Sequence, residues 1–172
     1  MSKKRSSPKD RTPHEEDRRG KRAAILVAID FSHCSLIALR KAKSLASRDS
    51  GRLVALHVID HHFVQQCIHE RLGTEREIKK KLFLSAKARL RDFLRREGLE
   101  RDDVDMVVCE GTPCVEINKA AVKSDAQMVV MGSKGNSDDM QTIFFGSTTE
   151  KVLRFIRRPV LCVPPDWDYK LK

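Results

Sequence analysis

The residues with the clearest chemical potential lie in two glycine-containing segments in the second half of the chain. The first is Met131-Gly132-Ser133-Lys134-Gly135, which directly follows an apolar run. The second is Gly146-Ser147-Thr148-Thr149-Glu150, which opens an amphipathic segment typical of a helix. A glycine loop after a strand, followed by a glycine-serine helix start, can direct several backbone N–H groups toward one anion. This pattern indicates phosphate binding, and therefore nucleotide binding.

The elements that must position these segments follow from an alternation of apolar runs and periodic segments. Apolar runs predict strands over residues 23–29, 53–59, 104–108, 127–131 and 159–163. Helical periodicity predicts helices after Ser32, over Glu75–Arg96, from Thr112-Pro113, and over Ser147–Arg157. Continuous apolar strands that alternate with helices predict an α/β fold, a doubly wound five-stranded parallel sheet with helices on both faces.

The same periodicity predicts which side chains the first two helices bury. The predicted apolar face after Ser32 comprises Leu36, Leu39, Ala42, Leu45 and Ala46. The predicted buried set of the long basic helix comprises Leu82, Leu84, Ala86, Leu90, Phe93 and Leu94. Gly98 lies just beyond that helix, where a glycine commonly ends helices.

Three groups of candidate binding residues fall at the carboxyl ends of predicted strands, where sheets of this type bind ligands. They are Asp30, the segment 58–60 and the glycine loop 132–135. Asp30 could accept hydrogen bonds from ribose hydroxyls, and backbone groups near Val58 could bind the edge of an adenine. The glycine loop and the helix start at Gly146 would then hold phosphates.

Composition predicts one domain with a distinct basic tail. The chain has 172 residues. Residues 1–22 contain too few apolar side chains to form a core, so we expect a disordered tail there. We expect one domain over residues 23–165 and a short polar tail over 166–172. No apolar run is long enough to cross a membrane, and five scattered cysteines indicate a reducing, cytoplasmic compartment. The net charge of +10 divides equally between 1–22 and 70–97. This charge favours anionic partners. The alternative is that the basic tail and the basic helix face are simply exposed to solvent and bind no partner.

Four ordered motifs resemble the universal stress protein family. They are Ile29-Asp30-Phe31-Ser32, Leu56-His57-Val58-Ile59-Asp60, Gly111-Thr112-Pro113, and Gly132-x-x-Gly135 followed by Gly146-Ser147 and the strand at 158–163. The resemblance covers residues 23–164. It implies the adenine nucleotide alpha hydrolase-like fold with sheet order 3-2-1-4-5, a role in stress response, and a homodimer that pairs through the last strand.

The resemblance also implies ATP binding, with Mg²⁺, by matching positions of this chain. The implied contacts are Asp30 for ribose, the backbone of Val58 for adenine with Ala28 near the base, Met131 and Gly132 for the nucleoside and first phosphate, and Gly135, Gly146, Ser147 and Thr148 for the triphosphate. No general base or water-positioning residue is evident beside the phosphates, so no catalytic residue is predicted and any ATP hydrolysis would be slow.

Two other functions remain open at the level of sequence. Ten residues separate Gly135 from Gly146, where the family signature has nine, and they include Asp138 and Asp139. The longer, acidic loop favours a second hypothesis, the same fold without nucleotide, acting as a protein-interaction and signalling module. A third hypothesis is nucleic-acid binding through residues 1–22 and the basic helix at 70–97.

Several of these residues also have purely structural interpretations. Ser147 and Glu150 fit a capping box, which would satisfy the N–H groups of a helix start. Asp30 could cap the helix that follows it, while Gly132 and Gly135 could simply allow turn conformations. The histidines near 57–69 match no common zinc spacing, so no metal site is predicted.

Overall fold

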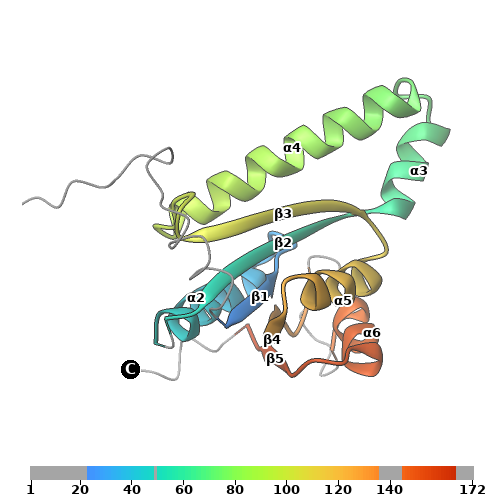
Figure 1. The fold of residues 1–172 in the computed structure, drawn as a ribbon. Helices are drawn as coiled ribbons and strands as arrows, with labels where there is room; N and C mark the ends of the chain where they lie inside the picture. Colours follow the sequence, from blue (N-terminus) through green and yellow to red (C-terminus); the bar gives the residue numbers. More distant parts are fainter. Residues whose placement is uncertain (1–22, 49, 136–144, 166–172) are drawn as a thin grey trace, which may run out of the picture.

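The protein is described by a computed structural model, which defines residues 23–48, 50–135 and 145–165. The predicted tails 1–22 and 166–172, and the loop that contains Asp138 and Asp139, lie outside these residues. Five parallel strands form one sheet in the order β3-β2-β1-β4-β5 (Figure 1). The strands are β1 (Ala24–Ala28), β2 (Arg52–Asp60), β3 (Val104–Gly111), β4 (Ala126–Gly132) and β5 (Val160–Val163). The predicted fold class and strand order are confirmed.

Five helices in the described part of the chain surround this sheet. They are α2 (His33–Arg48), α3 (His61–His69), α4 (Glu75–Arg96), α5 (Pro113–Lys123) and α6 (Ser147–Phe155). Helices α2 and α4 pack on one face, and α5 and α6 pack on the other, which gives three layers (Figure 1). Within the described residues, no helix is both long enough and apolar enough to cross a membrane.

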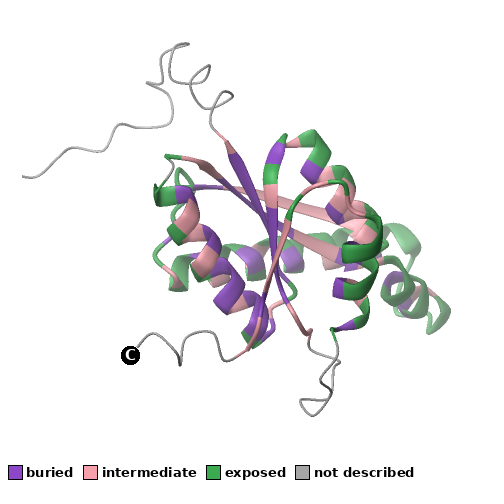
Figure 2. Cartoon of the chain, turned by 90° about the horizontal axis from the view of Figure 1, so that it is seen from below, coloured by how far each residue is buried: buried purple, intermediate pink, exposed green. Residues whose placement is uncertain are grey.

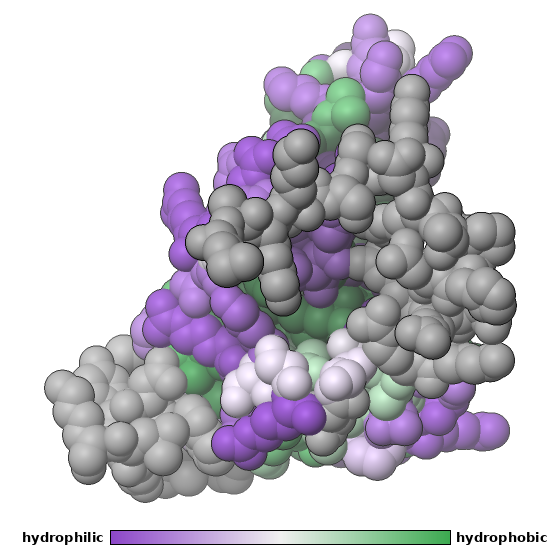
Figure 3. Space-filling model, turned by 60° about the vertical axis from the view of Figure 1, so that its left-hand side comes forward, coloured by the Kyte–Doolittle hydropathy of each residue, from purple (hydrophilic) through white to green (hydrophobic). Residues whose placement is uncertain are grey.

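Both faces of the sheet are buried, which explains why the strand sequences are continuously apolar. Ile25 and Val27 of β1 pack toward α2 and α4. Leu26, between them, packs toward α5 and α6. Figure 2 shows the result, buried central strands with more exposed helices around them. Figure 3 shows one side of the surface, where a hydrophobic hollow is bordered by hydrophilic side chains.

The long helix α4 has well-defined ends. Thr74 and Glu77 form a reciprocal capping box at its start. Beyond its last turn, Gly98 has a φ of +68°, and the N–H of Leu99 donates to the carbonyl of Leu94 at 3.1 Å. This left-handed glycine is the helix end predicted for Gly98, because residues with a Cβ rarely adopt that conformation.

The structure corrects part of the predicted core. Helix α4 buries Ile78, Ala86, Leu90 and Leu94, which are separated by multiples of four residues and so share one face. Leu84, predicted as buried, points away from that face and is 56% exposed. Leu82 and Phe93, also in the predicted set, are half-buried.

Two further differences concern the other helices. In α2 the residues Ile37 and Ala38 are buried, while the predicted Leu36 and Leu45 are only half-buried. Helix α3 was not predicted at all. It buries only Val64 and Cys67, so its apolar periodicity is too short to be recognised in the sequence.

We expect Leu90→Ala to lower the free energy of unfolding by about 3 kcal/mol, because Leu90 is fully buried between α4 and the sheet. The matched control is Leu84→Ala on the same helix, which should change stability by less than about 0.5 kcal/mol. Urea unfolding followed by circular dichroism measures both. Equal losses would contradict the observed face of α4.

Candidate functional site

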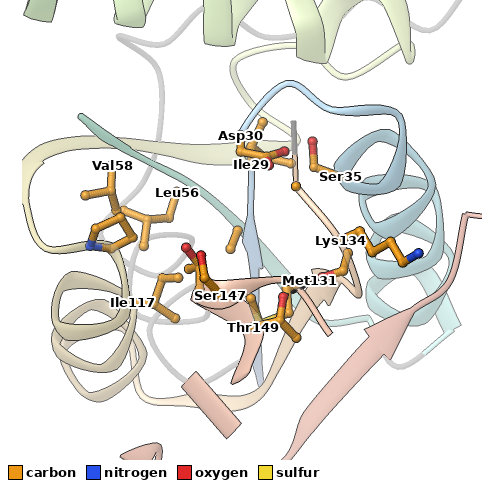
Figure 4. A pocket seen from close by; sticks show the side chains of 16 residues that line it. Ile29, Asp30, Ser35, Leu56, Val58, Ile117, Met131, Lys134, Ser147 and Thr149 are labelled. Atoms are coloured by element: carbon orange, nitrogen blue, oxygen red, sulfur yellow. Dashed lines mark hydrogen bonds between the residues drawn. The ribbon is translucent and has the colours of Figure 1, made fainter. Parts of the chain in front are cut away.

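A cavity of about 250 Å³ opens at the carboxyl ends of strands β1, β2 and β4 (Figure 4). Parallel strands place these ends at one edge of the sheet, so residues distant in sequence meet there. All nine predicted binding residues line this cavity: Ala28, Asp30, Val58, Met131, Gly132, Gly135, Gly146, Ser147 and Thr148. The residues predicted from the sequence therefore lie around one concavity, to which they come from four separate segments of the chain.

The cavity has an apolar part and a polar part. Val58, Leu56 and Ile117 lie together on one side of the view in Figure 4. The polar part is formed by Asp30, Ser35 and the start of α6. A cavity with one apolar wall and a few convergent polar groups is suited to a ligand with a flat apolar ring and a polar extension.

Asp30 is fixed by a local hydrogen-bond network. Its Oδ1 accepts from the N–H of Ser32 at 2.9 Å and from the Oγ–H of Ser32 at 2.5 Å. The same Ser32 Oγ accepts from the N–H of Ser35 at 3.1 Å, which is the geometry of a helix cap. The interpretation of Asp30 as the cap of α2 is therefore wrong. Ser32 caps the helix, and Asp30 orients Ser32.

The residue after Asp30 is held in an uncommon conformation by aromatic packing. Phe31 has a φ of +66°, which is rare for a large side chain. Its ring lies 4.4 Å from that of His57 and 5.6 Å from that of Phe93, and the guanidinium of Arg89 lies 4.1 Å above it. These contacts from β2 and α4 fix the turn that presents Asp30 to the cavity.

His57 supports the same turn from within the sheet. Its Nδ1 lies 2.8 Å from the carbonyl oxygen of Ile29, and this acceptor requires the proton to be on Nδ1. Burial lowers the pKa of His57 below its usual value, despite the opposing effect of that hydrogen bond. The ring is therefore neutral at pH 7 and acts as a structural hydrogen-bond donor.

Gly132 allows β4 to approach the start of α2 closely. A Cβ at this position would lie 2.6 Å from Cys34 Cβ and 2.9 Å from the Cys34 carbonyl carbon. The Gly132 carbonyl also accepts from Thr149 Oγ1 at 3.0 Å, which joins β4 to α6. The backbone φ is outside the left-handed region, so the interpretation of this glycine as a turn residue is wrong. Its role is close packing.

Gly135 is constrained by a neighbouring side chain. A Cβ there would lie 2.9 Å from Asp30 Oδ2, and its φ is also outside the left-handed region. The turn interpretation is wrong here too. The small residue at 135 brings the loop after β4 against the carboxylate at the end of β1.

The start of α6 differs from the predicted capping box. Gly146 occupies the N-cap position, so Ser147 is the first helical residue and cannot act as the cap. Glu150 does not complete a box either, because its carboxylate pairs with Arg154 at 3.0 Å. Helix geometry leaves the N–H groups of Ser147 and Thr148 without a carbonyl acceptor within the helix. These two residues line the cavity, which makes this helix start suited to an anion.

Further lining residues were not assigned to the site from the sequence. They include Ser35, Leu56, Ile117, Lys134 and Thr149. Leu56 could have been found, since it lies two residues before Val58 and so shares its side of β2. Lys134 lies within the glycine loop, but in Figure 4 its side chain extends away from the centre of the cavity.

Comparison with known proteins agrees with this architecture. The family model described as "Universal stress protein family" matches residues 21–164. The chain belongs to the universal stress protein family. Universal stress protein MJ0577 of Methanocaldococcus jannaschii is 30% identical over 154 residues, with 81% of this chain and 93% of that protein covered.

Solved structures of the family share the fold. The structure of MJ0577 has a TM-score of 0.69 and covers 83% of this chain and 95% of its own. A universal stress protein from Archaeoglobus fulgidus in complex with dAMP is 24% identical, with a TM-score of 0.53 and coverage of 82% and 97%. A universal stress protein in complex with cAMP is 22% identical, with a TM-score of 0.54 and coverage of 84% and 98%. Some members of this family therefore bind adenine nucleotides.

We expect Gly132→Ala to lower the free energy of unfolding by about 1–3 kcal/mol, because the new methyl group would meet the backbone of Cys34. Gly135→Ala is the matched comparison. Its methyl group would meet only the end of the Asp30 side chain, which can move, so we expect a smaller loss. Thermal and urea unfolding measure both variants. A Gly132→Ala protein as stable as the native chain would contradict the packing role.

Proposed function

We propose that this universal stress protein binds ATP and acts in the cytoplasm as a nucleotide-responsive regulator of the stress response. The proposal rests on the convergence of nine residues, from four segments of the chain, around one cavity at the carboxyl edge of the sheet. The complexes of relatives with cAMP and dAMP support an adenine nucleotide as the ligand class. The cytoplasm is the compartment predicted from the cysteine pattern.

The residues present fit an adenine nucleotide in one orientation. The adenine would lie against Ala28, Val58 and Ile117, with the Val58 backbone at its polar edge. The Asp30 carboxylate would accept from the ribose hydroxyls. The phosphates would then extend toward Gly135 and the start of α6, where the N–H groups and the positive end of the helix dipole favour negative charge.

The same residues account for binding better than for hydrolysis. Among the described residues that line the cavity, Asp30 is the one carboxylate, and it belongs to the proposed ribose position. The positive groups at the phosphates would be backbone N–H groups, with Mg²⁺ supplying further charge compensation when ATP binds. A site that holds nucleotide without a base to activate water suits a sensor, whose bound state reports the nucleotide supply.

We expect Asp30→Ala to weaken ATP binding about 10- to 100-fold, because it removes hydrogen bonds from a charged acceptor to the ribose. Isothermal titration calorimetry with ATP and Mg²⁺ measures this loss. The native protein should also prefer ATP over 2′,3′-dideoxy-ATP, and the variant should bind both equally.

The control for this experiment is Asp60→Ala. Asp60 also ends a strand, but its carboxylate accepts from the N–H of His62 at the start of α3 and does not line the cavity. We expect ATP affinity in this variant to be unchanged. An unaltered affinity in Asp30→Ala would refute the ribose assignment.

We further propose that the protein is a homodimer that pairs through the last strand. Strand β5 forms one edge of the sheet and offers backbone groups to a second copy. Beside it in Figure 1, α6 exposes Leu153 (41%) and Phe155 (68%). Large exposed apolar side chains next to a sheet edge are typical of an interface.

We expect Phe155→Glu to convert the dimer to monomer, because a charge would be buried without a partner at the interface. Light scattering coupled to size-exclusion chromatography measures the mass. Leu72→Glu, at a residue equally exposed but at the turn between α3 and α4, should leave the dimer intact. A native protein that is monomeric, or equal effects of both substitutions, would count against the β5 interface.

A further inference from the structure

The edge of the sheet opposite β5 carries a second concavity, remote from the proposed nucleotide site. It has a volume of about 280 Å³ and lies between the second half of α4 and strand β3. Its apolar residues include Leu94, Leu99 and Met106. Its charged residues are Lys87, Arg91, Arg95, Arg101 and Glu100. We call this concavity, together with the outer edge of β3, the β3 groove.

Strand β3 is an edge strand along its whole length. It pairs with β2 from Val104 to Gly111, and no described strand pairs with its other side. From Asp105 to Gly111 every residue is half-buried, in contrast with the buried residues of the central strand β1. An edge of eight residues presents a row of backbone N–H and C=O groups to which another extended segment can pair.

The groove has an uncompensated positive charge. Within the described residues, no carboxylate forms an ion pair with Lys87, Arg91, Arg95 or Arg101, the four cations that line it.

The carboxylates of β3 itself are already engaged. Asp105 pairs with Arg52 at 2.8 Å. Glu110 lies 3.1 Å from His61 and 3.5 Å from Lys79. The lining of the concavity therefore has four cationic side chains and one carboxylate, that of Glu100, and this net positive charge favours the binding of carboxylates.

We propose that the β3 groove binds an extended acidic segment of a partner protein, which pairs with β3 as a sixth strand. Backbone hydrogen bonds to the strand edge would supply affinity, and side chains would supply specificity. Met106 and Val108 pack on the side of the sheet that α4 covers. Alternate residues of the added strand would point to this same side, where Arg91 and Arg95 would meet carboxylates.

Charge distinguishes this partner from the nearest alternatives. The chain's own residues 1–22 carry a net charge of +5, so the groove would repel them. A second copy that paired through β3 would bring two basic grooves together. Nucleic acid has the right charge, but it cannot pair with a strand edge, and the described residues that line the groove include no aromatic side chain for stacking on bases.

The test uses a fluorescein-labelled octapeptide of alternating Glu and Val with the full-length protein. Fluorescence anisotropy should show saturable binding, and hydrogen exchange should show protection of β3 amides on binding. Two control peptides are the alternating Lys and Val octapeptide, which should not bind, and a block peptide of four Glu then four Val. The block peptide has the same charge but cannot direct all carboxylates to one side of a strand, so we expect weaker binding.

Matched variants of α4 test whether peptide binding depends on the cations of the groove or only on the positive charge of the whole helix. The double variant Arg91→Glu/Arg95→Glu should weaken binding of the alternating Glu and Val peptide by about tenfold or more. The control, Lys80→Glu/Lys81→Glu, makes the same change in charge at exposed residues of the same helix outside the groove, and should have much less effect. ATP affinity should be the same in both variants.

Three results would overturn the proposal. One is equal loss of binding in the two double variants. Another is equal binding of the alternating and block peptides while β3 amides remain unprotected, which would indicate attraction by charge alone. The third is full displacement of the peptide by a single-stranded oligonucleotide of equal charge, without protection of β3, which would indicate a nucleic-acid surface. None of them bears on the proposed ATP binding, because the two concavities share no lining residue.

Discussion

The close approach of Gly132 to Cys34 is the contact on which the proposed site depends most. It places the end of β4 directly against the first turn of α2, with no room for a Cβ. The same glycine accepts from Thr149 of α6, and the neighbouring Ser133 links Val163 of β5 to Gly146 through its N–H and its carbonyl, each at 2.9 Å. Helices α2 and α6 and strand β5 are therefore positioned by one short segment of backbone at the end of β4.

This constraint explains how a parallel sheet becomes a binding site. Parallel strands bring their carboxyl ends to one edge, but they do not fix the distance between the loops that follow. Gly132 and Gly135 fix it on one side, by packing against Cys34 and approaching Asp30. On the other side, Phe31 is held between rings and a guanidinium, so the turn at Asp30 is defined before any ligand arrives. Preorganisation of this kind reduces the entropy lost on binding.

The sequence predicted the sheet and brought together residues that line one cavity, but it did not predict the structural roles of several of them. Continuous apolar strands and the motifs at their ends are local signals, so the strands could be placed from the sequence. The packing of Gly132 depends on Cys34, almost one hundred residues away, and no local pattern encodes that distance. Leu84 fits an apolar helix pattern, but only the sheet determines which side of α4 is covered. Helix α3 buries too few side chains to produce a periodic signal.

The central claim is that the cavity at the carboxyl edge of the sheet holds ATP, and the most direct measurement is of nucleotide that the protein itself retains. The protein would be purified without added nucleotide and denatured, and the released small molecules identified by chromatography and mass spectrometry. The account predicts ATP or ADP at close to one molecule per chain. A protein that releases none, and that also fails to bind added ATP with Mg²⁺, would contradict it and would favour the same fold acting as a nucleotide-free interaction module.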